Sequence, residues 1–172
     1  PNHLDVHKDM EEYIEAKRNI LRHQNAFSRT VLNADNVITA SMAELVRGDL
    51  RWFSRQNPVR NGAYLDADGF LCYNEHGSVT KLFHKDEIRI PGMHNVENYL
   101  AAIAALWGEV DPEIMRKIAQ EFPGVEHRIE FVRERRGAPW YNASIATSPT
   151  RPIAGLSCFP QKVILIGGGY DK

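Results

Sequence analysis

Thr30-Val31-Leu32-Asn33-Ala34-Asp35 decides the fold class, because this stretch is a short apolar run that ends in a polar turn. Such a run is typical of a buried β-strand. The segment from Ser41 to Arg47 follows closely and is predicted to form a short helix with the serine as its N-cap. A strand followed by a helix predicts an α/β layer.

An amphipathic helix is predicted upstream, over residues 8–24, with Asp9 available as its N-cap. Its apolar side chains recur with the helical period of about 3.6 residues. They are Met10, Tyr13, Ile14, Ile20 and Leu21. The helix therefore precedes the buried strand.

Short strands are predicted downstream, over residues 63–65, 70–73 and 79–84, with polar turns between them. This spacing indicates a small antiparallel meander, which we expect to be an appendage to the main sheet. Two helices are predicted next, over residues 95–107 and 112–122, because apolar residues again follow a helical stripe.

Asp111-Pro112-Glu113 supplies the N-cap, N1 and N2 residues of the second of these helices. Pro123-Gly124 breaks that helix, and alternating residues then predict a hairpin around Arg136-Gly137-Ala138. We therefore expect a domain boundary here, with one domain over residues 1–123 and another over residues 124–172.

The last predicted elements are a helix that begins at Ser148-Pro149 and a buried parallel strand over residues 163–166. The glycines at 167–169 close that strand. A glycine turn after a strand is a weak cue for an anion site, which Lys172 could serve.

Composition excludes several classes of protein. Hydrophobic residues make up 43% and charged residues 25%, as in soluble globular domains, and the apolar runs are far shorter than the roughly 20 residues that span a membrane. The net charge of -1 argues against nucleic acid as a partner. The basic run Arg133 to Arg136 is interpreted as a solvated hairpin tip.

Two cysteines, Cys72 and Cys158, fit neither a paired metal motif nor a disulfide framework. We interpret both as reduced thiols of a cytoplasmic protein. The chain begins at Pro1 without a signal peptide and stops directly after a glycine turn. Both ends are therefore expected to be cut.

Lys17 falls on the stripe of the first helix that should be apolar, three residues after Ile14. One interpretation is that its methylenes cover the core edge while the ammonium reaches water. The other is functional, since partial desolvation lowers the pKa of a lysine and frees its amine to capture carbon dioxide as a carbamate. A carbamate would be an oxygen ligand for a hard metal ion, with His3 and Asp5 as further candidates.

Two other places admit a structural and a functional interpretation. Asn95 and Asn98 stand at the start of the helix over residues 95–107, where they would act as cap and exposed amide or would read a purine edge. Arg128 lies just past the expected domain boundary. It is either an ordinary surface arginine or a residue whose forked guanidinium group binds phosphate oxygens.

Five motifs stand in order along the chain: Asn2-His3-Leu4-Asp5, Tyr13-Ile14-Glu15-Ala16-Lys17, Gly92-Met93-His94-Asn95-Val96-Glu97-Asn98, Phe122-Pro123-Gly124-Val125-Glu126-His127-Arg128 and the run from Tyr141 to Thr150. Together they resemble the Mur ligase family, over essentially the whole chain. The resemblance implies part of a P-loop-type central α/β domain with a small antiparallel meander, followed by the start of a Rossmann-like C-terminal domain.

The run from Tyr141 to Thr150, followed by Leu165 to Lys172, resembles the D-glutamate-adding branch of the family. Other branches carry an Asp-Tyr-Ala-His type motif at that point. For the whole enzyme the resemblance implies an ATP- and Mg²⁺-dependent ligase of peptidoglycan precursor synthesis, monomeric and cytoplasmic. It would join D-glutamate to UDP-N-acetylmuramoyl-L-alanine through an acyl phosphate.

The same resemblance implies roles for single residues. Asn98 would read adenine with Asn95 beside it, and Arg128 would reach the nucleotide phosphates. Thr147 and Lys172 would contact D-glutamate.

In the catalytic centre, His3 would match a magnesium-ligand histidine and Lys17 a carbamylated lysine. One position departs from the pattern: the family usually has Asp where this chain has Ala143. Either the chain tolerates this loss or its activity is impaired.

The resemblance also implies an internal piece of a longer enzyme, because no Gly-Lys-Ser/Thr motif occurs in the sequence. The P-loop positions the phosphates, so we expect the chain alone to be inactive as a ligase. Two alternatives stay open: a folylpolyglutamate synthase-like ligase, which would lack the segment from Tyr141 to Lys172, and a noncatalytic nucleotide-binding or interaction relative. A generic α/β domain would leave the ordered motifs unexplained.

Overall fold

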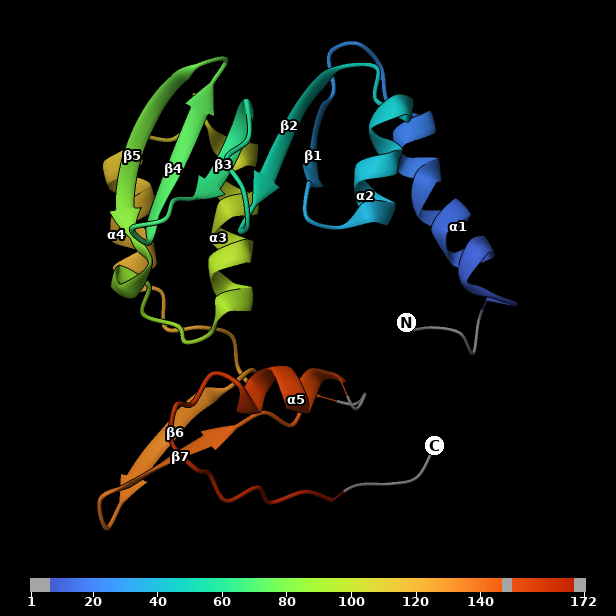
Figure 1. Ribbon diagram of the computed structural model, residues 1–172. Helices are drawn as coiled ribbons and strands as arrows, with labels where there is room; N and C mark the ends of the chain where they lie inside the picture. The colour runs from blue at the N-terminus through green and yellow to red at the C-terminus, as the bar shows by residue number, and fades with distance from the viewer. Residues whose placement is uncertain (1–6, 147–149, 169–172) are drawn as a thin grey trace. The chain divides into compact units, whose positions relative to one another are not determined.

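The computed structural model describes residues 7–146 and 150–168. The chain divides into two compact units, coloured mainly blue to yellow and orange to red in Figure 1. The first unit comprises Pro1–Ile90 and Asn95–Phe122, and the second comprises Pro91–His94 and Pro123–Lys172.

The first unit is built on one five-stranded sheet with the order β1-β2-β3-β4-β5. Its strands are β1 (Arg29–Asn33), β2 (Asp49–Ser54), β3 (Asn61–Leu65), β4 (Phe70–Glu75) and β5 (Ser78–His84). β2 pairs in parallel with both β1 and β3, whereas β4 pairs in antiparallel fashion with β3 and β5. The predicted α/β class and the three strands of the meander are confirmed.

The meander is not an appendage, however, because β3 is hydrogen-bonded to β2 within the main sheet. Gly62 allows this pairing. It has a φ of +146°, and a Cβ atom there would lie only 1.9 Å from the carbonyl oxygen of Trp52. A residue without a side chain is required for two backbones to approach so closely.

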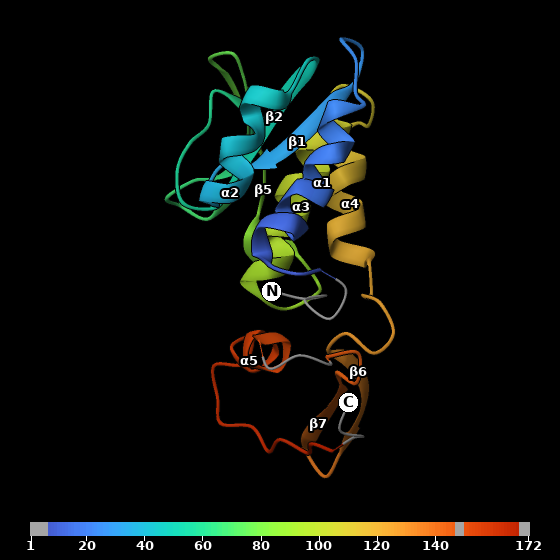
Figure 2. The same ribbon diagram turned by 90° about the vertical axis from the view of Figure 1, so that its right-hand side faces the viewer.

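α1 (Met10–Arg22) begins where the sequence predicts, since Asp9 Oδ1 accepts a hydrogen bond from the backbone N–H of Glu12 at 2.9 Å. The acceptor satisfies one of the N–H groups that the first helical turn leaves unpaired. The helix runs beside β1 and η1 (Figure 2).

The short helix after β1 starts earlier than the sequence predicts. It consists of α2 (Val37–Ser41) and the 3₁₀ helix η1 (Met42–Leu45). Its N-cap is Asn36, whose side-chain oxygen accepts from the N–H groups of Ile38 and Thr39 at 3.0 and 3.1 Å. Ser41 occupies the N-cap position of η1, as predicted, but its side chain makes no capping bond, because Ser41 Oγ donates to the carbonyl of Ile38 instead.

Two longer helices complete the first unit. α3 (Met93–Leu106) and α4 (Pro112–Glu121) confirm the predicted pair, and the 3₁₀ helix η2 (Lys85–Glu87) precedes them. Asp111 caps α4 as predicted, with its carboxylate accepting from the N–H of Glu113 at 2.8 Å.

Two clusters of buried side chains lie on opposite faces of β1, because successive residues of a strand point to opposite sides. Leu32 packs with Leu21 of α1 and Met42 of η1. Val31 packs against the larger cluster, in which α3 and α4 cover the sheet. The buried members of that cluster are Ala63, Leu71, Tyr73, Phe83, Ile88, Val96, Leu100, Ile103, Ala104, Met115 and Ala119.

The second unit contains a hairpin of β6 (Glu130–Arg135) and β7 (Ala138–Asn142), followed by α5 (Thr150–Leu156). Arg136 and Gly137, with φ values of 54° and 76°, make the turn of the hairpin. The predicted hairpin is therefore confirmed.

The strand predicted over residues 163–166 is absent, and Ile164 and Ile166 are 94% and 77% exposed. A strand needs a neighbour for its backbone N–H and C=O groups, and within the described residues none pairs with this run. The predicted helix start at Ser148-Pro149 lies outside the described residues. None of the helices in the described part of the chain has the length and apolar character that crossing a membrane requires.

Candidate functional site

Polar side chains gather at the carboxyl edge, by which we mean the end of the first unit's sheet where β1 and β2 finish at Asn33 and Ser54. Asp35 joins the two strand ends, since its carboxylate accepts from Ser54 Oγ at 2.6 Å and from the backbone N–H of Arg55 at 2.7 Å. Ligands of open α/β sheets bind beyond the carboxyl ends of parallel strands. The carboxyl edge is therefore the candidate ligand-binding site.

Ser54 fixes the loop that leaves β2. It is fully buried, and its hydroxyl oxygen accepts from the backbone N–H groups of Gln56 and Asn57 at 3.1 and 2.9 Å. With the hydroxyl proton directed at Asp35, the Ser54 side chain has a partner for its donor and for its acceptor sites. This arrangement makes the start of the loop a rigid platform.

Asn95 and Asn98 lie together at the amino-terminal end of α3, where Asn98 Nδ2 donates to Asn95 Oδ1 at 3.3 Å. Asn98 is exposed and Asn95 is half-buried. The intervening Glu97 reaches the loop after β2, with Glu97 Oε1 2.8 Å from Arg55 Nε. The amide pair therefore lies at the carboxyl edge, and side-chain amides can form planar hydrogen bonds to a ligand.

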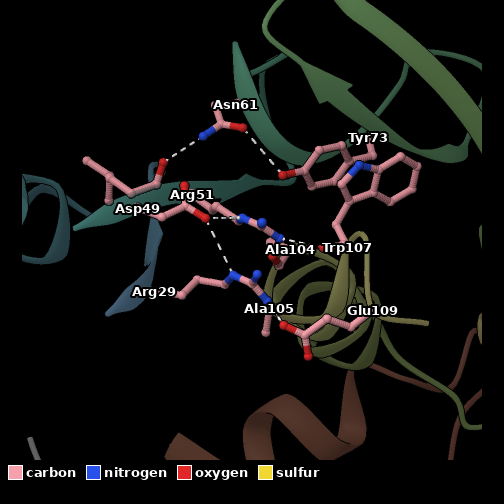
Figure 3. Close-up of polar contacts among 10 residues, drawn as sticks. Arg29, Asp49, Arg51, Asn61, Tyr73, Ala104, Ala105, Trp107 and Glu109 are labelled. Carbon is pink, nitrogen blue, oxygen red and sulfur yellow. Dashed lines mark hydrogen bonds and ion pairs between the residues drawn. The ribbon is translucent and has the colours of Figure 1, made fainter. Parts of the chain in front are cut away.

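The opposite end of α3 is anchored by two arginines (Figure 3). Arg51 Nη1 donates to the carbonyl oxygens of Ala104 and Trp107 at 3.0 and 2.9 Å, and Arg29 Nη1 donates to that of Ala105 at 2.6 Å. The last carbonyls of a helix have no partner within it, and their partial negative charge attracts cations.

A carboxylate holds the two guanidinium groups in place. Asp49 Oδ2 lies 2.8 Å from Arg51 Nε and 3.4 Å from Arg29 Nε (Figure 3). Glu109 lies 2.6 Å from Arg29 Nη1 on the other side and, as the main cause, raises the pKa of that arginine above its ordinary value. α3 is thus tied to β1 and β2 at both of its ends.

Lys17 is exposed on α1, so its predicted position on the apolar stripe of that helix is wrong. The core face of α1 is marked instead by Leu21 and the half-buried Ile14. Lys17 Nζ lies 5.4 Å from the centre of the Tyr13 ring, at cation–π distance.

The metal site predicted around Lys17 cannot be built from the described residues alone. His3 and Asp5 lie outside them, and the described part of the chain contains no group of three His, Cys, Asp or Glu side chains suited to a metal ion. The described residues around Lys17 therefore do not form a set of Mg²⁺ ligands.

Arg128 belongs to the second unit, where it is exposed in the turn before β6. Its neighbours His127 and Ile129 have φ values of 65° and 51°, a conformation that is unusual for side chains of their kind. Asn142 Nδ2 lies 2.9 Å from His127 Nδ1 and 3.4 Å from Glu130 Oε2, which ties this turn to the end of β7.

The remaining predicted contacts are placed as follows. Ala143 is exposed directly after β7. Thr147 and Lys172 lie outside the described residues. Cys72 and Cys158 are free thiols, as predicted, and burial raises the pKa of Cys72 to about 11.

Four residues of the candidate site were not predicted from the sequence: Asp35, Ser54, Arg55 and Glu97. The reason is that β2 itself was not predicted, because Arg51 interrupts the apolar residues of that strand. The available signal was the alternation of Leu50 and Trp52 on one face, followed by a serine at the strand's end.

Comparison with known proteins identifies the fold and the relatives of the chain. The family model described as the Mur ligase middle domain matches residues 1–106. Among solved structures, MurF from Acinetobacter baumannii aligns with a TM-score of 0.68 at 19% identity, covering 94% of this chain and 35% of that one. This second similarity shows the fold alone.

Two curated relatives match all of the chain. The UDP-N-acetylmuramoylalanine--D-glutamate ligase of Acetivibrio thermocellus is 55% identical over 172 residues, and that of Clostridium acetobutylicum is 51% identical over 173. The chain spans 37% of the length of each. Because the family model covers more than half of a chain that folds around the expected α/β sheet, this chain belongs to the Mur ligase family.

Proposed function

We propose that the chain is an internal part of a ligase that adds D-glutamate to UDP-N-acetylmuramoyl-L-alanine in peptidoglycan precursor synthesis. The observation that carries the proposal is the 55% identity, over the whole chain, with a relative that bears the name of this activity. The paired amides at the carboxyl edge support it, because they offer a nucleotide-binding surface in the expected place.

In the proposed reaction, ATP transfers its γ-phosphoryl group to the carboxylate of the L-alanyl residue, which gives an acyl phosphate and ADP. The amine of D-glutamate then attacks the acyl carbon, forms the amide bond, loses a proton and expels phosphate. The Mur ligase family is ATP-dependent. Cationic groups offset the charge that accumulates on the transferred phosphoryl group.

The described residues take part in nucleotide binding. Asn98, supported by Asn95, reads the adenine edge through its amide, and Arg128 reaches the phosphates with its planar fork. We also propose that the chain's domains divide as residues 1–123 and 124–172, which assigns Arg128 to the second of them.

Other roles fall on Lys17 of α1 and on three residues outside the described ranges, His3, Thr147 and Lys172. Lys17, once its amine has captured carbon dioxide and released a proton, becomes a carbamate, and together with His3 it offers Mg²⁺ ligands of the kind that this ion prefers. Thr147 and Lys172 contact D-glutamate. We further propose a monomeric, cytoplasmic enzyme without nucleic acid or membrane as a partner.

A second candidate function is a noncatalytic relative that kept the fold. One observation favours it, namely Ala143 in place of the usual acidic residue. A folylpolyglutamate synthase-like ligase is disfavoured, because the relatives that match the chain to its last residues are named D-glutamate ligases.

The test is a calorimetric titration of ATP with Mg²⁺ into the 172-residue chain and into the full-length protein, together with phosphate release upon addition of D-glutamate. We expect turnover only in the full-length protein. Asn98→Ala should raise the KM for ATP about tenfold, the equivalent of about 1.4 kcal/mol.

The matched control is Asn19→Ala. Asn19 is another exposed asparagine on a helix, and its side-chain oxygen accepts a hydrogen bond from Arg22 Nη1 at 3.2 Å. It should leave the KM for ATP unchanged. Absence of both ATP binding and D-glutamate-dependent turnover in the full-length protein would overturn the proposal in favour of the noncatalytic relative.

A further inference from the structure

We infer that Arg55 and Glu97 form a positioning pair that sets the rotation of α3, so that Asn95 and Asn98 present their amides to the nucleotide. The inference rests on the proposed function, in which these two asparagines bind adenine. Neither Arg55 nor Glu97 is expected to touch the reacting atoms.

Arg55 is carried by the rigid start of the loop after β2. Its backbone N–H donates to Asp35 Oδ2 at 2.7 Å, while the preceding Ser54 is fully buried and donates to the other oxygen of the same carboxylate at 2.6 Å. The Cα atom of Arg55 is therefore fixed relative to both parallel strands. A side chain that begins from a fixed backbone loses less entropy when it forms a contact.

The side chain of Arg55 then bridges to α3. Its Nε atom lies 2.8 Å from Glu97 Oε1, and the two side chains are only 38% and 34% exposed. Nε is buried and its N–H does not align as a hydrogen bond, so the contact is an ion pair held by charge. Among the described residues, Glu97 provides the one carboxylate within ion-pair distance of Arg55.

Glu97 is placed to control the direction of the amides. Successive residues of an α-helix are rotated by about 100°, so fixing Glu97 against the loop after β2 fixes the direction in which Asn98 points. Asn95, one turn earlier, follows it through the hydrogen bond between the two amides. A rotation of α3 would move both amides away from a planar base.

The other end of α3 cannot take over this role. Arg29 and Arg51 bind the carbonyls of Ala104, Ala105 and Trp107, which lie about 1.7 to 2.5 helical turns beyond Asn98. They fix the position of the helix along its axis and tie its carboxyl end to the sheet. The amino-terminal turn, which carries the amides, is held by the pair of Arg55 and Glu97 together with Val96, which is buried in the main core.

The experiment measures ligase kinetics in the full-length protein with Arg55→Met, Glu97→Gln and the charge-reversed double variant R55E/E97R. For each single variant the KM for ATP should rise about fivefold, or about 1 kcal/mol, with kcat and the KM for D-glutamate unchanged. The preference for ATP over GTP should fall in parallel. The double variant should restore the KM for ATP, because it rebuilds the pair with its charges exchanged.

Arg116→Met is the matched control, because Arg116 Nε forms a 2.7 Å pair with Glu87 and is 44% exposed, far from the amides in sequence. A merely structural pair would lower stability in both arginine variants and would leave nucleotide selectivity unchanged. Equal KM values for ATP in the Arg55→Met and Arg116→Met proteins would overturn the inference while the proposed function stands. If the unaltered full-length protein shows no ATP-dependent turnover, the proposed function itself fails, and the inference fails with it.

Discussion

The indole of Trp107 stacks on the ring of Tyr73, with the ring centres 4.1 Å apart and the planes 7° from parallel. Tyr73 lies on β4 and Trp107 directly after α3, so the stack joins the end of the helix to the antiparallel part of the sheet. The Tyr73 hydroxyl lies 3.4 Å from Asn61 Oδ1, and Asn61 Nδ2 donates to the carbonyl of Leu50 at 2.8 Å (Figure 3). One aromatic pair thereby connects α3, β4, β3 and β2.

Replacing Trp107 by alanine should destabilise the 172-residue chain by about 3 kcal/mol, because it removes a large ring from the edge of the main core. Urea unfolding followed by circular dichroism measures this change. Trp107→Phe keeps a ring that can stack and should cost about 1 kcal/mol. Equal losses of unfolding free energy in Trp107→Ala and Trp107→Phe would show that the stack itself contributes nothing to stability.

Replacing Arg51 by methionine should cost about 2 kcal/mol of unfolding free energy. The change leaves the carbonyl oxygens of Ala104 and Trp107 without their donor, at a site where the Arg51 side chain is only 12% exposed. Urea unfolding at constant salt is the measurement.

The control for Arg51 is Lys85→Met, which breaks an exposed pair with Asp86. It should change the stability by less than about 0.5 kcal/mol. Arg51→Lys should lie between the two, since a lysine keeps the charge but lacks the planar fork. If Arg51→Met lowered the unfolding free energy as little as Lys85→Met does, the anchoring of α3 by Arg51 would be contradicted.

Glu87 should make the stability of the first unit depend on pH in the acidic range. Hydrogen bonding from Arg116, with a further bond from the backbone N–H of His84, lowers the pKa of Glu87 below its ordinary value of 4.5. The stability that Glu87 contributes is therefore fully present above about pH 4.5 and is lost as the pH falls through the folded-state pKa.

Glu87→Gln should consequently lower the melting temperature at pH 7, and the difference from the unaltered chain should shrink as the pH falls toward about 3. Thermal unfolding across this pH range gives the comparison. Glu44→Gln, at an exposed carboxylate of η1, should leave the pH profile unchanged. A constant difference between the Glu87→Gln and unaltered chains at every pH would refute the charge-based explanation.

Ala143→Asp should raise kcat/KM for ATP of the full-length ligase about tenfold, or about 1.4 kcal/mol in transition-state stabilisation. The position is exposed directly after β7, so the strand can accept a carboxylate there without repacking. Phosphate release that depends on D-glutamate is the assay.

Ala138→Asp adds the same charge at the start of β7 and should have no effect on turnover. An unchanged rate for Ala143→Asp would mean that this chain has adapted to alanine. The prediction would then be wrong, although the proposed ligase activity would remain.

Within the candidate site, the sequence could predict only contacts between near neighbours. Asn95 and Asn98 are three residues apart on a strongly periodic segment, and the structure places their side chains in contact. The bond between Asp35 and Ser54 spans 19 residues, and that between Arg51 and Ala104 spans 53, so neither could be predicted from local spacing. Lys17 shows the same limit, because its exposure depends on which face of α1 the sheet covers.

The sequence by itself determined the α/β class, the helices over α1, α3 and α4, and the turn of the β6–β7 hairpin. The physical reason is that caps such as Asp9 and Asp111 and turn residues such as Gly137 act on backbone groups within a few positions. Only the tertiary structure decided that the meander continues the main sheet through Gly62 and that α3 is tied at both ends. These features depend on which strand lies beside which, and backbone pairing between distant segments leaves little trace in local sequence.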